Sequence, residues 1–124
     1  MNEGPVYTKS FDFALRIIKL KKHLNTEHKE FDLARQILRS GTSIGANAAE
    51  AHYAQSKSDF ISKMSVALKE ASETKFWLKL LYAADYLTDN EFSSLQNDCE
   101  ELISILSSII KTSKDTDPAL AGSR

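Results

Sequence analysis

Residues 35–51 read RQILRSGTSIGANAAEA, and the apolar residues in and just before this stretch decide the fold class. Apolar and small residues recur here at intervals of three and four, as on one face of a helix. They are Ala34, Ile37, Leu38, Gly41, Ile44, Gly45 and Ala48. This spacing predicts a helix from about Lys29 to Ala54. Two glycines inside a helix cost about 1 kcal/mol each relative to alanine, which indicates that another backbone approaches closely there. The alternative is a break near Arg39–Ser43, although the apolar phase is the same on both sides.

Three further segments, over about residues 8–25, 58–84 and 88–112, keep their apolar residues in helical phase. Ser56 or Ser58 can cap the helix that has Asp59 in its first turn, and Thr88 and Glu91 have the spacing of a capping box. Proline occurs only at positions 5 and 118, so the interval between them lacks the strongest helix breaker.

The links between these segments are short, at residues 25–28, 55–57 and 85–87. Short links force neighbouring helices to run antiparallel. We therefore predict an all-α fold, an antiparallel up-down-up-down four-helix bundle over residues 1–112. Residues 113–124 hold few apolar residues and no period, which predicts a mobile C-terminal tail.

The composition is that of one soluble globular domain, with 124 residues, 42% hydrophobic and 27% charged. No apolar run reaches the roughly 18–20 residues that span a bilayer, and the N-terminus lacks the pattern of a secretory signal. We expect a cytoplasmic protein without a membrane partner. The single cysteine, Cys99, lies within an apolar helical pattern, so we interpret it as a core residue rather than a nucleophile.

Charge is distributed unevenly along a chain whose net charge is −1. Residues 1–30 hold six Lys and Arg against four Asp and Glu, and residues 56–84 hold five against three. Residues 85–112 hold one against six. Two basic helices and one acidic helix can steer association with a partner, or they can be ordinary solvated faces.

The sequence contains no motif that is typical of an enzyme active site. A di-iron carboxylate centre needs Glu-x-x-His pairs, whereas Glu50 and His52 are two residues apart and diverge by about 200° around a helix. Cys99 has no CxxC companion for zinc. No G-x-S-x-G elbow occurs, and no lysine follows Gly45 as a phosphate-binding loop requires. We predict no enzyme activity, catalytic residue, cofactor, metal or small-molecule substrate.

A stripe of mostly small polar residues is the most informative feature of the second helix. Its members, spaced four, three, four and three apart, are Gln36, Ser40, Ser43, Asn47 and Glu50, with Arg39 beside them. Residues of the third helix that are available to meet the stripe are Glu70, Glu73 and Thr74. Small hydroxyls permit close approach, so the stripe is interpreted as a packing or assembly surface. A plain solvated face and a ligand site are the alternatives.

Aromatic residues gather late in the third helix, at Phe76, Trp77, Tyr82 and Tyr86, near Lys75 and Lys79. Aromatics beside lysines can stack on exposed nucleic-acid bases, but at helical spacing they more often belong to a core or a subunit interface. The first helix also has a wide apolar face. Together these residues leave more apolar surface than one bundle buries, which favours self-association with cyclic symmetry.

The stretches RQILRSGTSIGANAAEA and SKSDFISKMSVALKEASETKFWLKLL (residues 56–81) resemble the four-helix bundle proteins encoded in intervening sequences of bacterial 23S ribosomal RNA genes. The resemblance rests on Arg39-Ser40, Ser43-Ile44, Ala46-Asn47, Ala49-Glu50, Asp59-Phe60, Lys63, Ala67, Glu70, Glu73-Thr74 and Trp77-Leu78. It covers the second and third helices closely and the other two by pattern only.

This resemblance implies a four-helix bundle that assembles as a homopentamer and acts as a non-catalytic scaffold or adaptor. It also implies kinship with the accessory variability proteins of diversity-generating retroelements, which are basic and bind nucleic acid. Binding of RNA or DNA is therefore the alternative role, with Lys19, Lys21 and Lys22 as the candidate contacts, although this chain is nearly neutral. A di-metal carboxylate enzyme is the remote alternative. No catalytic residues come with the family.

Overall fold

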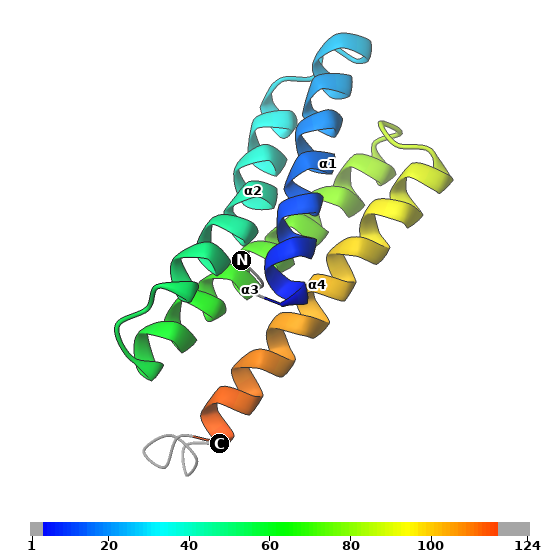
Figure 1. Cartoon of the computed structure of the whole chain (residues 1–124). Helices are drawn as coiled ribbons and strands as arrows, with labels where there is room; N and C mark the ends of the chain where they lie inside the picture. The colour runs from blue at the N-terminus through cyan, green and yellow to red at the C-terminus, as the bar shows by residue number, and fades with distance from the viewer. Residues whose placement is uncertain (1–3, 117–124) are drawn as a thin grey trace.

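The structure, a computed structural model that describes residues 4–116, contains four α-helices in sequence. They are α1 (Pro5–Glu27), α2 (Asp32–His52), α3 (Lys57–Ala83) and α4 (Asp89–Asp115). Figure 1 shows consecutive helices running in opposite directions, with the described start of α1 and the end of α4 toward the same end of the molecule. α2 packs extensively against α1 and α3, α3 packs against α4, and a smaller contact between α1 and α4 completes the bundle. The predicted all-α four-helix bundle is confirmed.

Local chemistry explains where α1 and α2 begin and end. α1 begins at Pro5, earlier than predicted, because the first position of a helix does not need the N–H that proline lacks. α2 begins at Asp32 rather than Lys29, because Lys29 has a φ of 53° in the left-handed region and so lies outside a right-handed helix. The Glu30 carboxylate then accepts a hydrogen bond from the backbone N–H of Leu33 at 2.5 Å.

The caps predicted for the last two helices are present. Ser56 caps α3 by accepting the N–H of Asp59 at 3.0 Å, and Thr88 and Glu91 form the reciprocal capping box of α4. α4 continues to Asp115, so residues 113–115, which the sequence assigned to the tail, are helical. Thr116 is the C-cap of α4, and residues 117–124 of the predicted mobile tail lie outside the described residues.

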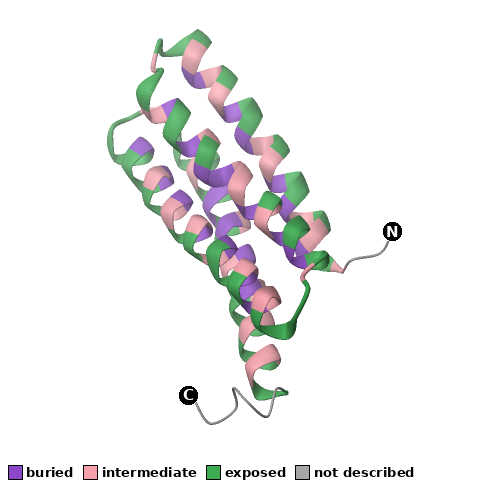
Figure 2. Cartoon of the chain, turned by 90° about the vertical axis from the view of Figure 1, so that its left-hand side faces the viewer, coloured by how far each residue is buried: buried purple, intermediate pink, exposed green. Residues whose placement is uncertain are grey.

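The core lies along the axis of the bundle, where the buried faces of all four helices meet (Figure 2). Its largest fully buried side chains are Phe13, Ile17, Leu24, Ile37, Ile44, Met64, Leu78, Leu81, Leu102 and Leu106. The three- and four-residue intervals of the sequence place these residues on one face of each helix. Burial of such apolar side chains contributes about 1.5–3 kcal/mol each and is the main force that holds the bundle together.

α2 runs without a break through both of its glycines, as predicted, and each glycine contacts α1. A Cβ on Gly41 would lie only 2.8 Å from Cγ1 of Ile17, closer than carbon atoms can approach. A Cβ on Gly45 would lie 3.4 Å from the backbone carbonyl oxygen of Ser10, an ordinary contact. The expected close approach of a backbone therefore occurs at Gly45, whereas at Gly41 the neighbour is a side chain.

The uneven charges of the sequence pair with one another on the surface of the bundle. Basic α1 pairs with acidic α4 through Lys9–Glu101 at 3.0 Å and Arg16–Asp98 at 2.6 Å. Basic α3 pairs with α4 through Lys75 and Glu100 at 3.3 Å. The two sides of the bundle that include α4 are thus bordered by ion pairs within one chain. Each described helix falls short of the combination of length and hydrophobicity that crossing a bilayer requires.

Candidate interaction surfaces

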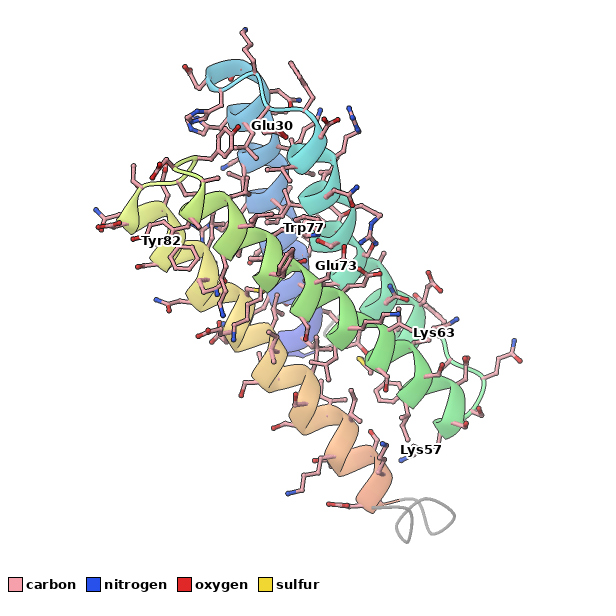
Figure 3. All side chains as sticks on the ribbon, turned by 180° about the vertical axis from the view of Figure 1, so that it is seen from behind. Glu30, Lys57, Lys63, Glu73, Trp77 and Tyr82 are labelled. Carbon is pink, nitrogen blue, oxygen red and sulfur yellow. The ribbon has the colours of Figure 1, made fainter. Side chains whose placement is uncertain are left out.

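Four side chains join α2 to α3 in what we call the α2–α3 clasp. They are Arg39, Glu70 and Glu73, which the sequence predicted to meet at this interface, and Trp77. The guanidinium of Arg39 donates through Nη1 to both oxygens of Glu70, at 3.1 and 3.3 Å, and through Nη2 to Glu73. The indole Nε1 of Trp77 donates to Oε2 of Glu73 at 3.0 Å. Figure 3 shows Glu73 and Trp77 on the side of α3 toward α2. The clasp ties the two helices together and fixes the orientation of the indole.

The electrostatics of the clasp follow from these bonds. The hydrogen bond from Trp77, followed by that from Arg39, lowers the pKa of Glu73, because both donors favour the ionised carboxylate. The hydrogen bond to Glu73 is the largest of the effects that raise the pKa of Arg39. Glu73 is therefore ionised at neutral pH. Because about a third of its side chain is accessible, solvent screens part of the attraction.

Directly inside the clasp, Ser40 and Thr74 are both fully buried. The hydroxyl of Thr74 donates to the hydroxyl oxygen of Ser40 at 2.9 Å and also lies 2.8 Å from the carbonyl oxygen of Glu70. Ser40 in turn lies 3.5 Å from the carbonyl oxygen of Ile37. Each buried hydroxyl thus has a partner, as buried polar groups require.

The other half of the polar stripe bonds mainly to its own helix. The hydroxyl of half-buried Ser43 donates to the carbonyl oxygen of Arg39 at 2.6 Å, and Nδ2 of half-buried Asn47 donates to the carbonyl oxygen of Ser43 at 2.8 Å. The side chain of Glu50 is 62% exposed, and its Oε1 lies 3.6 Å from Nζ of Lys63 on α3. Gln36 is also exposed. The structure therefore brings Arg39, Ser40 and the α3 residues together and leaves the end at Glu50 open.

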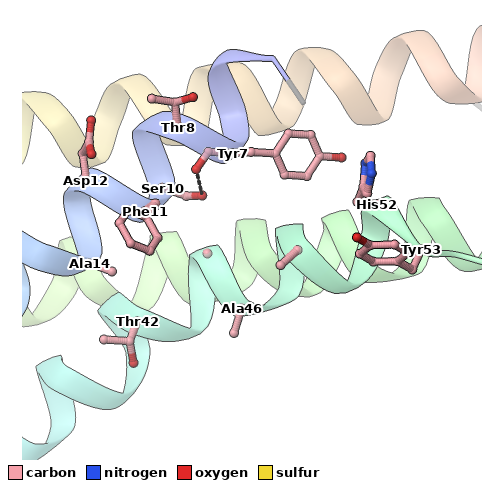
Figure 4. A pocket seen from close by; sticks show the side chains of 12 residues that line it. Tyr7, Thr8, Ser10, Phe11, Asp12, Ala14, Thr42, Ala46, His52 and Tyr53 are labelled. Atoms are coloured by element: carbon pink, nitrogen blue, oxygen red, sulfur yellow. Dashed lines mark hydrogen bonds between the residues drawn. The ribbon is translucent and has the colours of Figure 1, made fainter. Parts of the chain in front are cut away.

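On the opposite side of α2, a groove of about 680 Å³ runs between α1 and α2. Its floor has small residues of α2, Gly45, Ala46 and Ala49, and Phe11 and Tyr53 border it. Figure 4 shows Phe11 near one end of the groove and Tyr53 near the other, with Ala46 between them. Sequence reasoning missed this α1–α2 groove, although the small residues opposite the wide apolar face of the first helix were its signal.

Two surfaces that border α2 expose large apolar side chains. On α1, Phe11 is 65% exposed and Leu15 is 47% exposed, and Ile18 is also exposed. On α3, Phe76 is 56% exposed and packs edge-to-face on Trp77, with ring centroids 5.1 Å apart, while Leu80 is exposed one turn further along. The exposed apolar residues of α1 and those around Phe76 thus form two separate surfaces.

The aromatic residues nearer the end of α3 serve the fold. Tyr82 stacks on Phe92 of α4, with ring centroids 4.4 Å apart, and its hydroxyl donates to Asp89 at 2.5 Å. Tyr86 is half-buried, packs against the core and contacts the His28 ring edge-to-face. These two tyrosines therefore belong to the α3–α4 end of the bundle and offer no row of open rings for stacking on bases.

The lysines predicted as nucleic-acid contacts lie along α1. Lys19 and Lys22 are exposed and Lys21 is half-buried. Lys19 borders a hollow of about 350 Å³ together with Arg16 and Glu91. Because Arg16 is already paired with Asp98, this side of the bundle carries both charges rather than a single basic patch.

Cys99 is fully buried and its thiol donates to the carbonyl oxygen of Ala71 at 3.3 Å. Burial raises the pKa of this thiol to about 12, so it stays protonated at neutral pH and is a poor nucleophile. Among residues 4–116, no group of three or more His, Cys, Asp and Glu side chains is placed to hold a metal ion.

Known proteins resemble this chain over most of the four helices. The family described as 23S rRNA-intervening sequence protein matches residues 2–108. A crystal structure of a protein with unknown function from the S23 ribosomal protein family of Bacteroides thetaiotaomicron is 53% identical, with a TM-score of 0.86. The match covers 86% of this chain and 99% of that one. No protein with a curated description matches significantly.

Proposed function

Because the chain belongs to the family of 23S rRNA-intervening sequence proteins, we propose that it is a non-catalytic, self-assembling scaffold or adaptor. The resemblance of its second and third helices favours a homopentamer. The buried, protonated thiol of Cys99 supports the absence of covalent catalysis at the single cysteine. A reducing cytoplasm suits a fold that uses this cysteine as a core residue.

One observation carries the proposal of self-assembly: the row of exposed apolar residues Phe11, Leu15 and Ile18 on α1, beside the α1–α2 groove. Apolar side chains at positions 11, 15 and 18 share one side of a helix, so they form a continuous strip rather than scattered exposures. Contiguous exposed apolar surface marks a protein interaction site, because its removal from water favours association. A second copy of the same chain is the partner that symmetric assembly supplies.

The test is light scattering of the purified protein during size-exclusion chromatography. The chain has a mass of 13.9 kDa, so a pentamer has a mass of about 70 kDa. Leu15→Glu places a charge in the apolar strip and should shift the protein to monomer, whereas Ser107→Glu, at an exposed site on α4, should leave assembly unchanged. A wild-type monomer at micromolar concentration would contradict the proposal.

Nucleic-acid binding is a second role that the exposed lysines of α1 support. If Lys19 and Lys22 neutralise phosphates, affinity for structured RNA should fall steeply with salt. Lys19→Glu with Lys22→Glu should abolish that affinity, and Lys111→Glu, an exposed change on α4, should not. Wild-type protein that causes no shift of RNA at low salt would remove this role and leave the scaffold role intact.

A further inference from the structure

We propose that the bundle opens along the boundary between α1 and α4, and that two exposed ion pairs hold this boundary closed. The boundary is called the α1–α4 seam, and the ion pairs Lys9–Glu101 and Arg16–Asp98 are called the seam latch. In the open form α1 has moved away from α4, while α2 and α3 stay packed on each other. The opening takes place within one copy of the chain, so it requires neither self-assembly nor nucleic-acid binding.

The α1–α4 seam is the smallest of the four interfaces between adjacent helices. The contact between α1 and α4 is much less extensive than the contact between any two consecutive helices. Figure 1 shows α4 beside the start of α1 and diverging from α1 toward the α3–α4 link. Fewer packed atoms give less dispersion attraction and less apolar surface removed from water. Separating α1 from α4 therefore breaks fewer direct contacts than separating any consecutive pair.

Both ends of the seam are hollow. Next to the α3–α4 link, a hollow of about 350 Å³ is lined by residues of both helices, among them Leu20 of α1 and Leu95 of α4. At the other end, a hollow of about 440 Å³ has Val6 of α1 and Ile105 of α4 in its lining. Side chains that border an empty space lack partner atoms on that side. The seam thus lacks, at both ends, the close packing of a protein interior.

The other three interfaces are held by contacts that are buried. Between α1 and α2, Gly41 lets the two helices pack closely. Between α2 and α3, the fully buried hydroxyls of Ser40 and Thr74 are hydrogen-bonded at 2.9 Å. Between α3 and α4, the fully buried thiol of Cys99 donates to a backbone carbonyl of α3 at 3.3 Å. Water cannot replace these contacts without separating the helices, so these interfaces resist local opening.

The seam latch, in contrast, lies at the surface. Nζ of Lys9 lies 3.0 Å from Oε1 of Glu101, and Nη1 of Arg16 lies 2.6 Å from Oδ2 of Asp98. Nη2 of Arg16 also donates to the hydroxyl of Ser94 at 2.9 Å. The four charged side chains are 38–51% exposed, so water and salt screen their attraction. The latch is therefore weak, and the fraction of open molecules should rise with ionic strength.

The open form is a minor species, because it brings apolar residues such as Leu20 and Leu95 into contact with water. Minor open forms of this kind are detected by the reaction of groups that only the opening uncovers. A thiol at position 95, which is buried in the closed form and lines the seam, is such a group. A thiol at position 74 is buried between α2 and α3 and should stay covered when the seam opens.

The test compares Leu95→Cys with Thr74→Cys, both combined with Cys99→Ala so that each protein has one thiol. Iodoacetamide is the probe, because a neutral reagent does not itself respond to salt through charge. Urea denaturation of each variant gives the labelling rate that global unfolding alone allows. Leu95→Cys should react at least about tenfold faster than that rate, whereas Thr74→Cys should not exceed it.

Arg16→Gln, added to Leu95→Cys, tests the seam latch. It removes the ion pair with Asp98 and should accelerate labelling about two- to fivefold, as should an increase of sodium chloride to about 0.5 M. Lys75→Gln is the matched control, because it removes a similarly exposed ion pair, with Glu100, between α3 and α4. This control should leave the labelling rate of Leu95→Cys unchanged relative to global unfolding.

Each contrary result identifies what is wrong. Labelling of Leu95→Cys at the rate of global unfolding overturns the opening itself. Fast labelling that neither salt nor Arg16→Gln changes overturns the latch and means that the thiol is accessible in the closed form. Equal acceleration by Arg16→Gln and Lys75→Gln also overturns the latch, because the loss of any surface ion pair then has the same effect.

Discussion

The hydroxyl oxygens of Ser40 and Thr74 lie 2.9 Å apart across the α2–α3 interface, and neither residue is exposed to solvent. The two groups satisfy each other in a part of the core where water cannot replace a lost partner. Removing the Thr74 hydroxyl leaves Ser40 with only the 3.5 Å contact to the carbonyl oxygen of Ile37, whereas Thr74 without Ser40 keeps its 2.8 Å hydrogen bond to the carbonyl oxygen of Glu70. This polar pair is therefore a test of how α2 and α3 are held together.

Thr74→Val should lower the free energy of unfolding by about 1–3 kcal/mol, because it keeps the shape of the side chain and leaves the Ser40 hydroxyl poorly satisfied. The double variant Ser40→Ala with Thr74→Val should recover part of that loss, since both polar groups are then gone. Urea denaturation of the four species of the double-mutant cycle measures the coupling. Additive losses would mean that the two hydroxyls do not depend on each other.

Gly41→Ala should destabilise the bundle by about 1–3 kcal/mol, because the new Cβ would lie 2.8 Å from Ile17. Alanine is the better helix former by about 1 kcal/mol, but the overlap with both Cγ atoms of the buried, β-branched Ile17 outweighs this gain. Gly45→Ala is the control: its Cβ meets Ser10 at 3.4 Å, and the change should be neutral or stabilising. Thermal denaturation compares the two. Equal shifts of Tm would show that packing against Ile17 does not distinguish them.

Glu73→Gln should reduce stability at neutral pH and lose this effect in acid. The folded-state pKa of Glu73 is lowered, first by the hydrogen bond from Trp77 and then by that from Arg39. The ionised carboxylate therefore stabilises the fold above its unfolded pKa near 4.5, and this contribution disappears as pH falls below 4.5 through the folded value. The difference in Tm between wild type and variant should shrink over that range. Glu101→Gln, at a more exposed ion pair, is the comparison.

Cys99 should resist modification in the folded protein. Burial raises its thiol pKa to about 12, and only the thiolate reacts with a disulfide reagent such as dithiobis-nitrobenzoate. Colour development in buffer should be many-fold slower than in concentrated urea, and its rate should follow global opening of the bundle. Rapid, complete reaction of the native protein would place the thiol at the surface.

The helical pattern of α2 could be predicted from the sequence because a hydrophobic face is a property of one helix. Continuity through Gly41 followed from the shared apolar phase on both sides. The ends of the helices were less predictable. The left-handed φ of Lys29 sets the start of α2, and no local sequence pattern around that lysine predicts this φ. Pro5 was visible, but its use as the first residue of α1 was not inferred.

The relation between helices was only partly contained in the sequence. Glu70, Glu73 and Thr74 share a face with the right spacing to meet the stripe, and the structure brings them to Arg39 and Ser40. The four-residue interval between Glu73 and Trp77 also permitted their hydrogen bond. The α1–α2 groove is different, because it depends on how deeply two helices sit against each other. That depth is set by contacts between residues far apart in the chain.

The contact between Ile17 and Gly41 also constrains how the sequence can diverge. Ile17 occupies the space that a side chain at position 41 would need. A larger residue at either position alone would therefore cause strain. Across related genes, growth at position 41 should accompany shrinkage at position 17. Such paired substitutions would be evidence for the contact between α1 and α2 that does not depend on any measurement on the purified protein.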